Sequence, residues 1–425
     1  MKLKKATYNL YAFVVGKVVS SLGATVYGFV VSMYILQHTG SSLFFAINIL
    51  ISFLPRIITS PIVGVLADRY SRKKLVLLGM SIVVATLLLV ATYSFTFGMS
   101  VALLYVTTLF YQIGSSITSV SFTASITNLI DEDRIQKAMS FNQFVLSSTA
   151  ILGPILGGIL FGFVPFQWFF VGMAIMLTID LCISSTMHFT LYEKQSDVQV
   201  NKKDSVWKGV REGWAYVQNN YLLKKVFFMS SWINLFFTCI GVGGSFVMLQ
   251  KMFIAPTSIG IIEGFEAVGM LSMALLFSIM KPVRNPLRNA KWSIIALGCV
   301  LIAFIVPLLI PFSSLGTIIY LCTVMGLFGI FAMTTNMPLG VWMQKEIDEH
   351  QRGRVFGLLE MMAMIMMPVG TIAYGILFDY VSASALFIVS GIIIVCLSFY
   401  LLPQKVVHQV DEVKAKDEEL NATKI

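Results

Sequence analysis

The chain has 425 residues, 57% of them hydrophobic and only 12% charged, with a formal net charge of +9. Soluble domains carry roughly 25% charged residues, so this composition excludes a large soluble protein and predicts a chain embedded in a membrane. The basic residues are scattered over short polar stretches, which argues against a nucleic-acid partner.

Twelve apolar stretches have the length that a bilayer demands, about 20 residues each. Their apolar runs are continuous rather than alternating, which predicts helices and not barrel strands. We therefore expect an all-α membrane protein surrounded by the lipid bilayer. The expected spans cover 10–36, 42–67, 75–97, 100–126, 138–162, 166–189, 225–249, 257–280, 291–311, 315–342, 355–379 and 384–402.

Lys and Arg are distributed unevenly between the two sides of these spans. Of the 30 basic residues, 27 fall on the side that holds both termini, Lys251 falls on the other side, and Lys17 and Arg56 lie inside spans. By the positive-inside rule, both termini are expected to be cytoplasmic.

The polar stretch 190–224 divides the spans into two sets of six. We expect an N-terminal bundle over 1–189, a cytoplasmic linker over 190–224, a C-terminal bundle over 225–403 and a cytoplasmic tail over 404–425. Within the linker, apolar residues at helical spacing (Val206, Val210, Trp214, Val217) predict an amphipathic surface helix.

The two halves repeat at an offset of 217 residues. The sequence IDE at 130–132 recurs at 347–349, and GPILGGILF at 153–161 recurs as GTIAYGILF at 370–378. Two matches in one register indicate a duplication. Six spans in each half then predict parallel repeats related by an axis along the membrane normal.

Motifs of enzymes and metal sites are missing from the sequence. The five cysteines all fall within expected spans without a CxxC pair, and the four histidines show no ligand spacing. No P-loop, nucleophile elbow or HExxH sequence is present. The sequence therefore predicts no cofactor, no metal site and no enzyme activity.

The stretch GVLADRYSRKKL at 64–75 places five charges directly after an apolar run. It resembles the loop signature G-x-L-x-D-R-x-G-R-K of the major facilitator superfamily, with Ser71 in place of the usual glycine. The resemblance implies two pseudo-symmetric six-helix bundles that rock about a central cavity, latched on the cytoplasmic side by a gate. The implied gate residues are Gly64, Asp68, Arg69, Arg72, Lys73 and Arg354.

The sequence GPILGG at 153–158 matches the GPxxGG core of the signature carried by the antiporter branch of this family. Its residues Gly153, Pro154, Gly157 and Gly158 either pack helices tightly or form a bend that favours exchange over leakage, and both roles can hold together. GRVF at 353–356 and GVREGWAYV at 209–217 resemble the macrolide-efflux type of drug:proton antiporter. The span 100–126 departs from many drug antiporters because it contains no arginine.

Ionisable residues inside a membrane are costly and usually face a cavity or a partner. Glu263 and Glu266 share a helix face about 9 to 14 Å from the outer end of their span. Two carboxylates there repel each other, so we expect one to hold a proton near neutral pH. The candidates for proton coupling are Glu263, Glu266, Asp180, Glu360 and Arg56. A wet vestibule around the two glutamates, and structural ion pairs that include Lys17, are the alternatives.

Candidates for the substrate cavity are polar, aromatic or methionine side chains near the middle of a span, since large adaptable cavities use such residues. They are Tyr27, Gln112, Trp232, Asn234, Phe237, Asn336 and Met337. Any membrane bundle rich in Met and Phe offers similar residues, so ordinary packing is the alternative.

Together these patterns predict a monomeric secondary transporter in the cell membrane of a bacterium. We expect it to export amphipathic, macrolide-like small molecules in exchange for protons. The alternatives are a narrow exporter or symporter of a peptide, siderophore or lipid, and a non-transporting membrane receptor or immunity protein.

Overall fold

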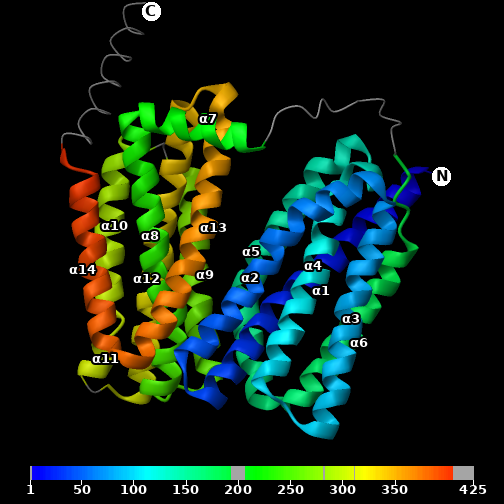
Figure 1. Ribbon diagram of the computed structural model, residues 1–425, viewed down its shortest axis with the longest axis horizontal. Coiled ribbons are helices and arrows are strands. Elements are labelled where there is room, and N and C mark those ends of the chain that lie inside the picture. Colours follow the sequence, from blue (N-terminus) through cyan, green and yellow to red (C-terminus); the bar gives the residue numbers. More distant parts are fainter. Residues whose placement is uncertain (1, 193–205, 281–282, 311, 405–425) are drawn as a thin grey trace, which may run out of the picture. The chain divides into compact units, whose positions relative to one another are not determined.

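The computed structural model is helical and describes residues 2–192, 206–280, 283–310 and 312–404 (Figure 1). It confirms the predicted all-α membrane fold in this part of the chain. The helices in chain order are α1 (Lys2–Thr39), α2 (Ser42–Arg69), α3 (Arg72–Phe97), α4 (Val101–Leu129), α5 (Glu132–Phe163), α6 (Phe166–Thr186), α7 (Val206–Asn219), α8 (Tyr221–Phe246), the π-helical turn η1 (Val247–Lys251), α9 (Pro256–Ile279), α10 (Pro286–Ala303), α11 (Val306–Leu309), α12 (Ser314–Glu346), α13 (Glu349–Tyr380) and α14 (Ala383–Leu401).

Eleven of the described helical segments are long and apolar enough to cross a membrane. The remaining predicted span, 355–379, lies in α13, whose described apolar part is the shorter segment Ile365–Tyr380. Several helices begin or end beyond the predicted spans, because the apolar pattern marks the hydrocarbon layer while a helix continues into the headgroup region.

The chain folds as two compact units. Unit 1 comprises Met1–Val198 and Ile254–Gly264, and unit 2 comprises Gln199–Phe253 and Phe265–Ile425. The first part of α9, residues 256–264, therefore belongs to unit 1 and the remainder to unit 2. The domain boundaries expected from the sequence stay predictions.

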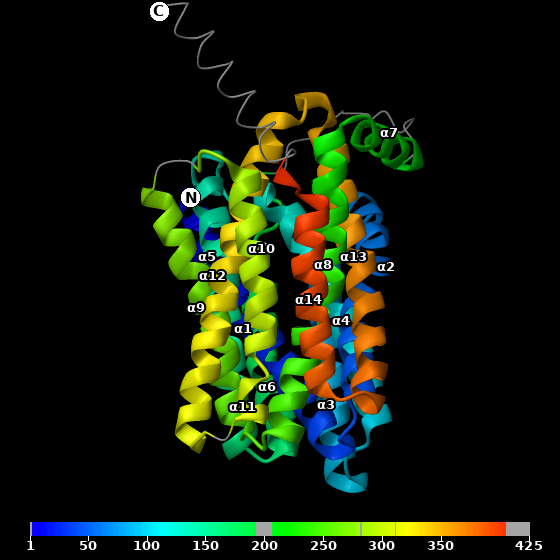
Figure 2. The same cartoon turned by 90° about the vertical axis from the view of Figure 1, so that its left-hand side faces the viewer.

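Each unit forms the same helix pairs. In unit 1, α1 packs against α5 and α6, and α3 packs against α4 and α6. In unit 2, α8 packs against α13 and α14, and α10 packs against α12 and α14; Figure 2 shows α14 beside α8 and α10. The first, third, fourth, fifth and sixth long helices of each half thus correspond, which agrees with the predicted duplication.

A shared glycine contact supports this correspondence. Gly153 of α5 lies against the side chain of Thr25 on α1, leaving no room for a Cβ atom. Gly370 of α13, which is 217 residues further on, lies in the same way against Thr238 of α8. Small residues let helix backbones approach closely in membranes, so both contacts fix the first and fifth helices of a unit together.

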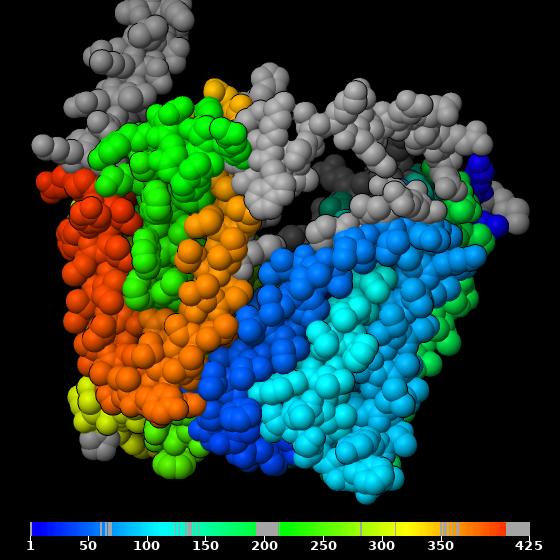
Figure 3. Space-filling model, viewed as in Figure 1, coloured from blue at the N-terminus to red at the C-terminus, as the bar shows by residue number. Residues whose placement is uncertain are grey.

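The predicted amphipathic helix is present as α7 and is attached to unit 2. Trp214 packs edge-on against Phe227 of α8, with 5.6 Å between the ring centroids. The Tyr216 hydroxyl donates to Asp348 Oδ2 at 3.1 Å and accepts from the Asp348 backbone N–H at 3.2 Å. In Figure 3 α7 lies across the ends of α8 and α13, so its apolar side chains pack on protein.

Proline residues free backbone carbonyls inside the helices of unit 2, and side chains from neighbouring helices bind those carbonyls. Pro307 lacks the N–H that would reach Ala303, and the helix breaks there between α10 and α11. The Tyr320 hydroxyl donates to the Ala303 carbonyl at 2.8 Å. Likewise, Pro338 frees the carbonyl of Thr334 in α12, and Asn289 Nδ2 donates to it at 2.8 Å. A membrane protein tolerates such prolines because neighbours complete the backbone bonding.

Asn9 joins three helices at one end of unit 1. Its fully buried amide group donates to the carbonyls of Leu129 and His188, both at 2.9 Å, and accepts from the His188 N–H at 3.0 Å. These partners lie just after or within the last turns of α6 and α4, so one side chain of α1 fixes both helix ends.

We expect Asn9→Leu to lower the stability of the folded protein by about 1–3 kcal/mol, because it leaves two carbonyls and one N–H buried without partners. Thermal unfolding in detergent measures the loss. The control is Asn219→Leu, which changes an exposed asparagine of α7. Equal stability of the two variants would contradict the assigned role of Asn9.

Asp131 and Arg134 form an ion pair at the start of α5, outside the spans. Arg134 Nε donates to Asp131 Oδ1 at 2.7 Å, and its Nη1 donates to the Thr7 hydroxyl at 2.8 Å. The Arg134 hydrogen bond holds the pKa of Asp131 below its ordinary value of 3.8. The pair therefore stabilises the fold above that value and is lost as pH falls through the lowered pKa.

We expect Asp131→Asn to cost about 0.5–1 kcal/mol, in the range of partly exposed ion pairs. The difference from the wild-type protein should stay constant from about pH 8 to pH 5 and shrink only below about pH 4, where the carboxylate protonates. Thermal unfolding at a series of pH values measures it. A difference that titrates near neutral pH would show that another group is responsible.

Candidate functional site

Unit 1 encloses a cavity of about 470 Å³ among its membrane-spanning helices. Hydroxyl groups make up much of its wall, and three ionisable side chains (Lys17, Arg56 and Asp180) line it together with Tyr111 and Asn142. The hydroxyl-bearing residues are Ser20, Ser21, Thr25, Ser115, Thr118, Ser119, Thr123 and Thr149. Polar groups gathered in a cavity at membrane depth are typical of a transport site.

Asp180 is the most deeply buried charged group of this cavity. It lies on α6 with only 1% of its surface exposed, and neither carboxyl oxygen has a hydrogen-bond partner among the described residues. Its Oδ1 atom lies against the backbone of α1 at Gly16, where a Cβ atom would come within 2.6 Å. The missing side chain of Gly16 therefore makes the space that the carboxyl occupies.

Lys17 of α1 and Arg56 of α2 line the same cavity. Their charges are close enough to repel each other. Within the described part of the chain, neither side chain donates a hydrogen bond, and neither lies within the 4.0 Å of a carboxylate oxygen that defines an ion pair. The cavity thus holds two cations and one carboxyl group without direct pairing.

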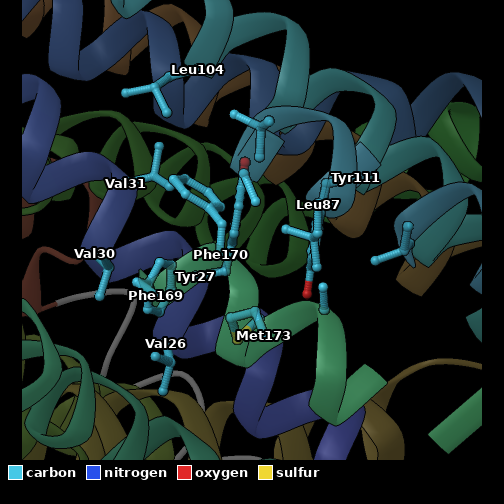
Figure 4. Close-up of a cluster of buried hydrophobic side chains, with 14 of the residues drawn as sticks. Val26, Tyr27, Val30, Val31, Leu87, Leu104, Tyr111, Phe169, Phe170 and Met173 are labelled. Carbon is cyan, nitrogen blue, oxygen red and sulfur yellow. The ribbon is translucent and has the colours of Figure 1, made fainter. Parts of the chain in front are cut away.

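A packed aromatic core lies beside the cavity. Tyr27 is 1% exposed and stacks on Tyr111 with 4.2 Å between ring centroids, while Phe170 meets it edge-on (Figure 4). The Tyr27 hydroxyl bonds the Thr108 hydroxyl at 3.0 Å, which donates to Asn48 Oδ1 at 3.1 Å. The structure therefore places the substrate candidate Tyr27 in the hydrophobic core of unit 1, where it supports Tyr111.

The residues of the GPILGG sequence make close helix contacts on two sides of α5. Gly153 and Gly157 lie against Thr25 and Phe29 of α1. Gly158 faces the first turn of α9, where a Cβ atom would lie 2.7 Å from the Pro256 carbonyl oxygen. The carbonyl oxygen of Pro154 in turn faces Gly260 of α9. The tight-packing interpretation of this motif agrees with these contacts, and its effect on leakage stays a prediction.

The other candidates for proton coupling lie apart from this cavity. Glu263 and Glu266 are half-buried on α9, and the division of the units falls between them. The side chain of Glu360 lies outside the described residues. Of the five candidates, Asp180 and Arg56 line the cavity of unit 1.

The gate is described only in part. Arg72 begins α3, and Lys73 donates to the Met187 carbonyl at the end of α6 at 3.2 Å, which joins the ends of two helices within unit 1. The side chains of Gly64, Asp68, Arg69 and Arg354 lie outside the described residues, so the latch stays a prediction.

The remaining substrate candidates differ in their surroundings. Gln112 is half-buried on α4. In unit 2, Trp232 and Asn336 are exposed, Met337 is half-buried, and Phe237 packs edge-on against Phe328 at 5.2 Å. Asn234 Nδ2 donates to the Ser230 carbonyl of its own helix at 2.8 Å.

Sequence reasoning missed the hydroxyl-rich wall of the cavity. The signal was present on α4, where Ser115, Thr118, Ser119 and Thr123 recur at helical spacing within an apolar span. A stripe of this kind marks one helix face, and in a membrane helix such a face turns away from lipid.

Comparisons with known proteins cover most of the chain. The family model for the Major Facilitator Superfamily matches residues 13–371. Macrolide efflux protein A of Streptococcus pyogenes is 23% identical over 392 residues, covering 92% of this chain and 94% of its own. The Staphyloferrin A transporter of Staphylococcus aureus is 24% identical over 378 residues, covering 84% and 87%. The crystal structure of a bacterial homologue of the iron transporter ferroportin shares the fold, with a TM-score of 0.70, 16% identity and coverage of 94% and 99%.

We expect Gly158→Ala and Gly260→Ala each to destabilise the protein by about 1–3 kcal/mol, because a methyl group would meet a backbone carbonyl of the facing helix. The controls are Gly28→Ala and Gly172→Ala, where no atom lies within 4 Å of the added Cβ. Alanine favours a helix more than glycine does, so these controls should be neutral or stabilising. Thermal unfolding of the four variants in detergent tests the contrast, and similar values for all four would refute the close-contact argument.

Proposed function

The chain belongs to the Major Facilitator Superfamily, and on this premise we propose that it is a secondary active exporter of amphipathic compounds, driven by protons that enter in exchange. It is a multi-pass membrane transporter and not an enzyme. The observation that carries the proposal is the cavity of unit 1, which holds the buried carboxyl group of Asp180.

A carboxylate in the middle of a membrane costs about 2.5–3.5 kcal/mol on insertion scales, and burial without a hydrogen-bond partner adds to this cost. Asp180 avoids the cost by holding a proton while it is enclosed and releasing it when the cavity opens to water. A group that changes its protonation with exposure in this way couples proton entry to alternating access. Lys17 and Arg56, the other charged groups of the cavity, stabilise the ionised form of Asp180 through the field that they create.

Export as the direction of transport is supported by the similarity to Macrolide efflux protein A over 94% of its length. The mixed wall of the cavity suits amphipathic compounds, since Phe13, Met80 and Leu177 offer apolar contacts opposite the hydroxyl groups. The Staphyloferrin A transporter supports a second candidate, an exporter with a narrow substrate range, because it matches a similar share of the chain.

The proposed setting is the plasma membrane of a bacterium, with both termini in the cytoplasm. The support for this orientation is the distribution of Lys and Arg, of which 27 in 30 fall on one side of the spans. We also propose that Asp68, Arg69, Arg72, Lys73 and Arg354 form a cytoplasmic latch that opens during transport and that Gly64 permits its turn.

We expect Asp180→Asn to abolish export driven by a proton gradient, because the amide copies the shape of the carboxyl group but carries no exchangeable proton for the cycle. Inside-out proteoliposomes with an acidic lumen, compared with protein-free liposomes, measure accumulation of three dansyl compounds: dansylcadaverine, 6-(dansylamino)hexanoic acid and Nε-dansyl-lysine. Those that the wild-type protein accumulates should fall at least about tenfold in the variant, a loss equivalent to roughly 1.4 kcal/mol.

The matched control is Glu346→Gln, which neutralises an exposed carboxylate at the end of α12. It should accumulate the compounds as the wild-type protein does. Proton-driven accumulation that persists in Asp180→Asn would exclude Asp180 as the proton carrier, and accumulation of no compound by the wild-type protein would count against export of amphipathic molecules.

A further inference from the structure

The charges of the unit 1 cavity are separated by sign. Lys17 and Arg56 repel each other and lie on α1 and α2, whereas Asp180 lies on α6 against the α1 backbone at Gly16. No oxygen of Asp180 comes within 4.0 Å of either cation. One enclosed space therefore presents a positive region and a negative region whose hydrogen-bonding groups are still available.

Such an arrangement is costly in the absence of a ligand. Each charged group inside a membrane costs about 2.5–3.5 kcal/mol, and pairing is the usual compensation. Elsewhere in unit 1 the polar groups of Asn9, Asn48 and Arg134 do find partners within the protein. The cavity is therefore the place where an external molecule can complete the bonding.

We propose that the substrate of this transporter is zwitterionic, with its carboxylate bound between Lys17 and Arg56 and its amine bound to Asp180. This inference rests on the proposed function and names the chemical class that the same cavity selects. Guanidinium and ammonium groups supply up to eight N–H donors to a carboxylate, and an ionised Asp180 accepts from an ammonium group.

The assignment agrees with proton exchange. An ammonium group and a proton compete for the same Asp180 carboxylate, so binding of the substrate favours release of the proton. The carboxylate of the substrate meanwhile offsets the repulsion between Lys17 and Arg56. A compound with an amine alone leaves both cations without a partner, and a compound with a carboxylate alone leaves Asp180 without one.

The three dansyl compounds form a matched series for a binding test. Nε-dansyl-lysine carries both an α-amine and a carboxylate, dansylcadaverine is the same chain without the carboxylate, and 6-(dansylamino)hexanoic acid is the same chain without the amine. Fluorescence titration of purified full-length protein in phosphatidylcholine nanodiscs gives the three dissociation constants. We expect Nε-dansyl-lysine to bind at least about tenfold more tightly than either relative.

Variants then assign each charge. Arg56→Gln and Lys17→Gln should weaken Nε-dansyl-lysine about tenfold and leave dansylcadaverine within about twofold of its wild-type affinity. Asp180→Asn should weaken Nε-dansyl-lysine and leave 6-(dansylamino)hexanoic acid unaffected. Lys251→Gln, which removes a cation near Phe246 outside this cavity, should change none of the three values.

Equal affinity of the wild-type protein for the three compounds would overturn the proposal, and so would a variant that weakens all three alike. These outcomes are separate from failure of the proposed function. Proton-driven export of dansylcadaverine without preference for Nε-dansyl-lysine would uphold the exporter and reject the zwitterion. Selective binding of Nε-dansyl-lysine without proton-driven accumulation would do the reverse.

Discussion

The need to satisfy polar groups without water governs this structure. In a bilayer, a backbone carbonyl released by proline or an amide side chain on a helix must find its partner within the protein. Unit 2 meets the need through Tyr320 and Asn289, which bond the carbonyls of Ala303 and Thr334. Unit 1 meets it through Asn9, which holds the ends of α4 and α6. These bonds fix helix positions that apolar packing alone would leave free to slide.

Measured against this requirement, the cavity of unit 1 is the exception. Asp180, Lys17 and Arg56 lie in one enclosed space, and their charged groups do not pair with each other. An arrangement that weakens the fold is retained where it serves binding, since a group already paired with its neighbour has little affinity left for a ligand. The same argument separates Asp180 from Asp131, which is tied to Arg134 and serves stability.

The sequence predicted much of the fold because spans, their repeat and the side of the basic residues depend on patterns along the chain. The candidate site was predicted less completely, because it depends on rotation about each helix. Tyr27 has the right depth for a cavity, yet it faces Tyr111 and Phe170 in the core. Asp180 was one of several carboxylates at similar depth, and only packing showed that it meets Gly16. Helices that are apolar all round carry little information on which face turns inward, and the hydroxyl residues of α4 were the exception.

The contacts of Gly153 with Thr25 and of Gly370 with Thr238 carry a historical consequence. Because they recur at the same offset in both halves, they were present before the ancestral gene doubled. The ancestor was then a six-span chain that already clamped its first helix to its fifth, and a pair of such chains would have been two equal copies. The lone carboxyl group of α6 has no counterpart at the same offset, where Leu397 stands in α14, so the two halves have since diverged in their chemistry while keeping their common frame.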